Sequence, residues 1–130
     1  MSIEITLLAV VLVLALVQIL WAAQARTSEL GLKWNAGPRD GETPPPGPLA
    51  GRLMRAQSNL FETLPLFIGA VLAAHITDAT GELTALGAQL YVFGRIVYLP
   101  LYVFGVPYLR SAVWAVSVVG LIMILAALFI

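Results

Sequence analysis

Two stripes of polar side chains interrupt long apolar stretches, and they hold most of the residues with which this chain could do chemistry. Neighbouring members of each stripe are three or four residues apart, a spacing that puts them on one face of a helix. The first stripe is Arg52, Arg55, Asn59 and Glu62, and the second is Tyr91, Arg95, Tyr98 and Tyr102. Arginine pairs with carboxylates, and amide and hydroxyl groups add hydrogen bonds. Together the stripes predict a site for an anionic ligand.

Positive charge exceeds negative charge in this set, because Arg110 adds a further cation and Glu62 is the only acid. The simpler interpretation is that Arg95 and Glu62 form an ion pair that only fixes helix packing. Arg52 alone is also explained as an anchor at the membrane surface. The surplus of arginine and the number of hydroxyl groups favour a ligand that carries carboxylates.

Metal and thiol chemistry by the protein itself is limited by composition. The chain has no cysteine and a single histidine, His75. Disulfides, cysteine-based metal sites and a protein thiolate nucleophile are therefore excluded, and no metal site is expected. Any thiol in the chemistry must come from the substrate.

The elements that carry these residues are predicted to lie in lipid. Hydrophobic residues make up 60% of the 130 residues and charged residues 11%, with zero net charge. A soluble domain has about 25% charged residues, and nucleic-acid binding needs surplus lysine and arginine, so nucleic acid is an unlikely partner. We expect one all-α domain over residues 1–130, with four transmembrane helices packed as a bundle. The expected spans are Ile5 to Ala23, Leu49 to Ile76, Leu83 to Phe104 and Val113 to Ile130.

A polar, proline-rich connection from Thr27 to Pro48 separates the first two spans. The lysine and arginine residues that flank the spans all fall on the side of this connection, and none lies near either terminus or in the second connection. By the positive-inside rule, residues 27–48 are predicted to be cytoplasmic, and both termini lie on the opposite side. The sequence thus predicts an integral, multi-pass membrane protein.

The depth of each stripe follows from the helical rise of 1.5 Å per residue. In the second span, Asn59 lies roughly 15 Å from the entry point and Glu62 roughly 20 Å. Arg95 lies roughly 14 Å from the end of the third span, which runs in the opposite direction. Arg95 is therefore expected level with Asn59 and close enough to Glu62 for an ion pair.

The stretch Arg55-Ala-Gln-Ser-Asn59-Leu-Phe-Glu62-Thr-Leu-Pro65-Leu-Phe67 resembles the second-helix signature of the MAPEG superfamily, the membrane-associated proteins in eicosanoid and glutathione metabolism. Its general form is Arg-Ala-x-x-Asn-x-x-Glu-x-x-Pro-x-Phe. The run from Gly94-Arg95 through Tyr98 and Tyr102 to Arg110 is also similar to the third and fourth helices of that family.

This resemblance implies a four-helix bundle that assembles as a homotrimer, with glutathione sites between subunits that open toward the cytoplasm. It implies that glutathione, as cosubstrate, is bound by six residues and that Arg110 stabilises its thiolate. The implied binding residues are Arg55, Asn59, Glu62, Arg95, Tyr98 and Tyr102. Two positions depart from the relatives. Thr63 stands where relatives of the leukotriene-C synthase type have a tyrosine. Trp114 stands near the position of a tyrosine in relatives of the prostaglandin E synthase type, although Ser111 matches the neighbouring serine of those relatives.

The resulting hypothesis is a membrane glutathione-dependent transferase or peroxidase that acts on a lipophilic small molecule arriving from the bilayer. The alternative is a non-catalytic lipid-binding or scaffold protein of the same fold. A small four-span multidrug transporter is disfavoured, because such proteins depend on an acidic residue inside the first span, and this span has none.

Overall fold

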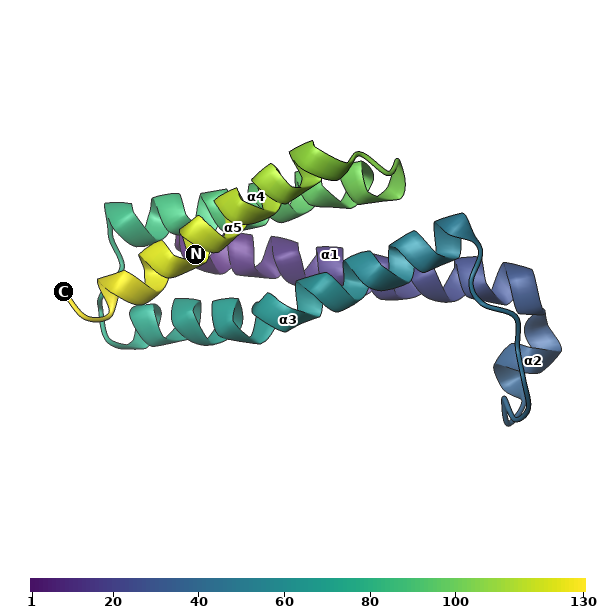
Figure 1. Ribbon diagram of the computed structural model, residues 1–130. Coiled ribbons are helices and arrows are strands. Elements are labelled where there is room, and N and C mark those ends of the chain that lie inside the picture. The colour runs from purple at the N-terminus through teal and green to yellow at the C-terminus, as the bar shows by residue number, and fades with distance from the viewer.

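The computed structural model describes all residues from 1 to 130 and consists of helices joined by short connections (Figure 1). Its elements, in chain order, are α1 (Ile3–Leu30), α2 (Leu32–Ala36), α3 (Pro48–Ile76), α4 (Glu82–Val103) and α5 (Pro107–Ala127). The four helices other than α2 are long enough and apolar enough to cross a membrane. The predicted all-α bundle with four membrane spans is therefore confirmed.

The helix boundaries differ from the predicted spans mainly at the first and last helices. α1 runs seven residues past Ala23, because its last two turns are polar and continue the helix outside the apolar stretch. The predicted connection therefore begins as helix, and irregular backbone occupies only residues 37–47 between α2 and α3. α5 begins at Pro107 rather than Val113, since proline is well suited to the first turn of a helix.

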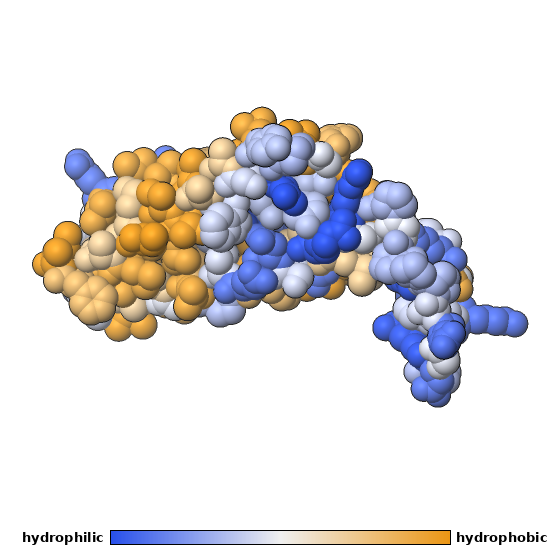
Figure 2. Space-filling view, viewed as in Figure 1, coloured by the Kyte–Doolittle hydropathy of each residue, from blue (hydrophilic) through white to orange (hydrophobic).

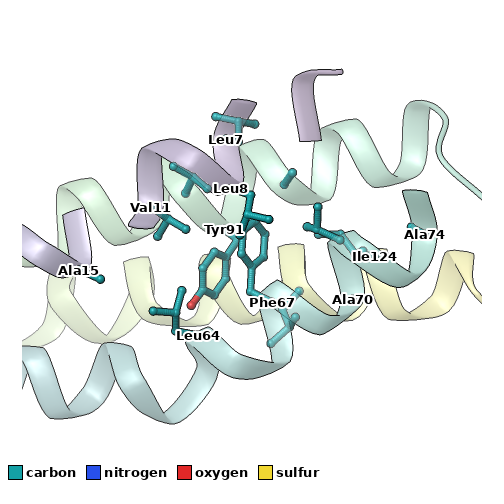
Figure 3. Packing of buried hydrophobic residues seen from close by; sticks show 14 of the residues in the cluster. Leu7, Leu8, Val11, Ala15, Leu64, Phe67, Ala70, Ala74, Tyr91 and Ile124 are labelled. Carbon is teal, nitrogen blue, oxygen red and sulfur yellow. The ribbon is translucent and has the colours of Figure 1, made fainter. Parts of the chain in front are cut away.

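The apolar core lies where α1, α3, α4 and α5 meet. Phe67 of α3 stacks on Tyr91 of α4 with ring centroids 4.2 Å apart, and both side chains are fully buried (Figure 3). Val11 of α1 and Ile124 of α5 belong to the same buried cluster. This core ties α3 to α4 at the inner end of the polar stripes, where Tyr91 belongs both to the core and to the second stripe.

α4 and α5 approach each other very closely because glycine stands at their contact. A Cβ atom at Gly87 would lie 2.6 Å from the carbonyl oxygen of Gly120, and one at Gly94 would lie 3.0 Å from the Cβ of Ser117. Such small residues let helix backbones pack without intervening side chains. The pair therefore behaves as one unit that carries the α4–α5 turn.

The two ends of the bundle differ in polarity. Both chain termini lie at one end, and α2 projects from the other, which we call the loop end (Figure 1). Hydrophilic residues gather toward the loop end and hydrophobic residues toward the termini (Figure 2). At the loop end the ion pair between Arg26 and Glu29, with N–O distance 2.9 Å, holds the proline-rich connection, because Glu29 Oε2 also accepts the Gly47 N–H.

The terminal end carries a buried carboxylate. Glu4 is 4% exposed and accepts a hydrogen bond of 2.9 Å from Thr84 Oγ1 in the first turn of α4. A carboxylate near a helix N-terminus is favoured by the helix dipole. This contact joins α1 to α4 at the end of the bundle where the termini lie.

Candidate functional site

A seam of polar contacts joins α3 to α4 at successive turns. Each rung pairs one residue of α3 with one of α4. From the loop end inward, the rungs are Arg52 Nη1 to the Val103 carbonyl at 3.2 Å, Arg55 Nε to Tyr102 OH at 3.2 Å, Arg95 Nη1 to Asn59 Oδ1 at 2.7 Å, and Thr63 Oγ1 with Tyr91 OH at 2.8 Å. Three of the four members of each predicted stripe thus contribute to this seam.

Two adjoining cavities open beside the outer rungs of this seam. The outer cavity, of about 260 Å³, is lined by Arg52, Arg55, Tyr102, Gly105, Val106, Pro107 and Arg110. The inner cavity, of about 230 Å³, is lined by Asn59, Tyr98, Tyr102, Arg110, Ser111 and Trp114. They share Tyr102 and Arg110, and we call them together the cationic cleft. Three arginines and no acidic residue line it, so it suits an anion.

Tyr102 stands between two cations in the cleft. The guanidinium carbon of Arg110 lies 4.7 Å from the centre of its ring, and that of Arg55 lies 5.9 Å away. The electron-rich face of an aromatic ring attracts cations at such distances. Arg55 also donates to the Tyr102 hydroxyl, which fixes the orientation of its guanidinium.

Arg110 differs from its neighbours because it forms no hydrogen bond and no ion pair within the chain, although it is only partly exposed. The α4–α5 turn places it over the cleft. Gly105 in this turn has φ +73, a backbone conformation that favours glycine, and a Cβ there would lie 3.0 Å from Arg52 Nη2, so that guanidinium would have to shift. The free guanidinium of Arg110 is therefore available to a ligand.

Arg95 is buried, 2% exposed, and lines neither cavity. Its guanidinium lies 4.2 Å above the ring of Tyr98. The prediction that Arg95 is level with Asn59 is confirmed by their hydrogen bond. The predicted ion pair with Glu62 is wrong: the chain's single ion pair joins Arg26 and Glu29, because the Glu62 side chain is exposed on α3, and Arg95 Nη1 donates to Asn59 instead.

Glu62 lies outside the cationic cleft. Its side chain is exposed on the surface of α3, one turn deeper than Asn59, and it makes no ion pair. Of the seven site residues that we predicted, the cleft thus contains Arg55, Asn59, Tyr98, Tyr102 and Arg110. Glu62 and Arg95 lie beside it.

Some of the lining could not be assigned a role from residue type. Gly105, Val106 and Pro107 contribute through the turn that they form, and Trp114 through its place one turn after Arg110. Arg52, which the sequence also explained as a surface anchor, does two things here: it caps the end of α4 and lines the outer cavity. In the sequence, the feature that could have assigned Arg52 to the site is its spacing of three residues from Arg55.

Four apolar spans define an integral, multi-pass membrane protein, and a cleft lined by three arginines opens beside the α3–α4 seam. The sequence model of the MAPEG family matches residues 6–130, essentially the whole chain. The protein therefore belongs to the MAPEG family, the membrane proteins of eicosanoid and glutathione metabolism. A search of curated proteins and a search of solved structures each gave no match.

Proposed function

We propose that this protein is a glutathione-dependent transferase or peroxidase that activates the glutathione thiol against a lipophilic electrophile. The observation that carries the proposal is the cationic cleft, whose three arginines include Arg110, a cation without a hydrogen bond or ion pair that lines both cavities. Membership of the MAPEG family supports glutathione as the cosubstrate.

Glutathione suits this cleft by charge. It carries two carboxylates and one ammonium group, so it is an anion even before its thiol ionises. Arg55, held by Tyr102, is placed to bind a carboxylate, and Arg52 adds positive charge at the mouth. Tyr98 and Asn59 line the inner cavity and add hydrogen bonds.

Arg110 is the residue assigned to the chemistry. A free thiol has an ordinary pKa of about 8.5, so little thiolate exists at neutral pH, and a neighbouring cation stabilises the thiolate. The thiol releases its proton to water, and the sulfur then forms a bond to the electrophilic carbon while the leaving group departs with the bonding electron pair. Arg110, which faces both cavities, is placed to stabilise the sulfur charge before that bond forms.

A homotrimer with glutathione sites between subunits is part of the proposal. Glu62 is exposed although it lies 14 residues, or roughly 21 Å, along α3 from Pro48. A charged side chain facing lipid at that depth costs about 2.5–3.5 kcal/mol even on insertion scales. Covering by a neighbouring subunit removes this cost and places Glu62 beside the ligand. The loop end is proposed to face the cytoplasm.

The test uses protein purified in mild detergent. Glutathione affinity is measured by calorimetry, and turnover is measured by conjugation of glutathione to 1-chloro-2,4-dinitrobenzene. We expect binding and conjugation by the wild-type protein and by Arg39→Ala, which removes an exposed arginine outside the cleft. Loss of both in Arg55→Ala would support the assignment. Wild-type protein that binds no glutathione would refute it.

The non-catalytic alternative has an observation of its own. An apolar groove of about 380 Å³ lies between α4 and α5, lined by residues that include Leu90, Phe93 and Val113. A lipid-binding protein would use such a groove and would leave the cleft without turnover. Glutathione binding without conjugation of any electrophile, together with retained lipid, would favour this function.

A further inference from the structure

We propose that Arg95 does not touch the ligand and instead is a positioning residue: it fixes the amide of Asn59 so that position 59 offers the ligand only hydrogen-bond donors. The inference deepens the glutathione-binding role proposed above and rests on it. It replaces the expectation, drawn from family resemblance, that Arg95 binds glutathione directly.

The direction of the Asn59 amide follows from the chemistry of the guanidinium group. Arg95 Nη1 lies 2.7 Å from Asn59 Oδ1. A guanidinium can only donate, so the amide atom that faces it must be the oxygen. The Nδ2 group, with its two N–H donors, is then left for the inner cavity, which Asn59 lines and Arg95 does not.

Arg95 itself is held firmly enough to impose this direction. It is 2% exposed, and its guanidinium lies 4.2 Å above the Tyr98 ring. Its Nε and Nη2 atoms are buried and have no hydrogen-bond partner, and no carboxylate lies within ion-pair distance. Asn59 Oδ1 is thus the acceptor on which this buried charge depends.

Reversal of the amide would set Nδ2 against the guanidinium, donor against donor. Loss of a hydrogen bond to a charged group makes the reversed amide about 10- to 150-fold less populated. Position 59 therefore selects for an acceptor on the ligand, a carboxylate or a peptide carbonyl, and against its ammonium group. This limits how glutathione can lie in the inner cavity.

The first experiment needs no ligand. Asn59→Asp gives the buried guanidinium a counter-ion, so it should raise the midpoint of unfolding by sodium dodecyl sulfate when residue 95 is arginine. In the Arg95→Met background the same substitution has no cation to pair with at that point, and it should lower the midpoint. A change of the same sign in both backgrounds would overturn the Arg95–Asn59 contact.

The second experiment is a double-mutant cycle on glutathione affinity. Arg95→Met should weaken binding roughly three- to tenfold in the wild-type background but less than about twofold in the Asn59→Ala background, since residues that act through one another are not additive. Equal losses in both backgrounds would mean that Arg95 contacts the ligand itself, and would overturn the proposal.

Two further variants complete the cycle. Arg95→Lys keeps a donor for Asn59 Oδ1, so it should restore most of the glutathione affinity that Arg95→Met loses. If Arg95 had a merely structural role, these variants would instead show a lowered midpoint of unfolding. Arg39→Met removes an arginine from the connection after α2 and should leave affinity unchanged. If the wild-type protein binds no glutathione, the proposed function fails, and the unfolding experiment still decides whether Arg95 fixes Asn59.

Discussion

The close contact between α4 and α5 makes a prediction that the structure allows to be worked out in detail. In Gly120→Ala, the new Cβ would lie 2.7 Å from the backbone nitrogen of Tyr91 and nearer still to the carbonyl oxygen of Gly87. Both are backbone atoms and cannot rotate away. An ordinary carbon contact is about 3.5–4.0 Å, so α5 must move outward by roughly 1 Å.

The energy of that displacement can be bounded. Overpacking a tight contact costs about 1–3 kcal/mol, and the helix propensity gained by replacing glycine with alanine returns at most ~1 kcal/mol. Gly120→Ala should therefore lower the free energy of unfolding by as much as about 2 kcal/mol. Because Arg110 lies ten residues, or roughly 15 Å, along the same helix, the shift should also lower turnover.

Gly69→Ala is the matched control. A Cβ at this position of α3 meets no atom within 4 Å, so only the gain in helix propensity remains. Unfolding of both variants is followed by circular dichroism during titration with sodium dodecyl sulfate. Equal stability of Gly120→Ala and Gly69→Ala would refute the argument that the two helices are locked by glycine contact.

Three further predictions follow from individual contacts. Arg55→Ala should weaken glutathione binding by about 1.5–3 kcal/mol, the value of a charged hydrogen bond. Arg110→Ala should lower thiolate absorbance and turnover more than it lowers glutathione affinity. An unchanged thiol pKa in Arg110→Ala would show that Arg110 takes no part in the chemistry. Thr84→Val leaves the buried Glu4 carboxylate without its 2.9 Å donor and should destabilise the protein by about 1–3 kcal/mol, while Thr84→Ser keeps the donor and should cost much less; equal losses would show that the hydroxyl is unimportant. A single cysteine at Ala36, in a chain without native cysteine, should resist an impermeant thiol reagent added outside intact cells, and labelling there would reverse the proposed orientation.

The spans and the membership of each polar stripe were predictable because both depend on local periodicity. Apolar runs of about 20 residues identify spans, and spacing by three and four identifies a helix face. The depth of Arg95 relative to Asn59 followed from the helical rise per residue alone. The helix ends were less predictable, since α1 continues through Leu30 into residues that no longer face lipid.

The partner of Arg95 shows where this reasoning stops. Depth placed both Asn59 and Glu62 within reach, and formal charge favoured Glu62. The structure pairs Arg95 with Asn59 rather than Glu62. The direction in which each side chain points from the axis of α3, together with the packing of Tyr98, decides which of the two faces the guanidinium. Periodicity along one helix carries no information about its rotation against another.

The sequence by itself determined that the chain lies in lipid, how many spans it has, which family it belongs to, and that arginine exceeds acidic residues in the polar stripes. These properties are sums over residues or spacings within one helix, so they do not depend on how helices meet. The tertiary structure decided that Tyr102 stands between Arg55 and Arg110, that Glu62 faces outward, and that Arg95 lies behind the cleft. The place of Arg110 depends on the α4–α5 turn at Gly105, and the others depend on helix–helix contacts between residues far apart in the chain, which no local pattern encodes.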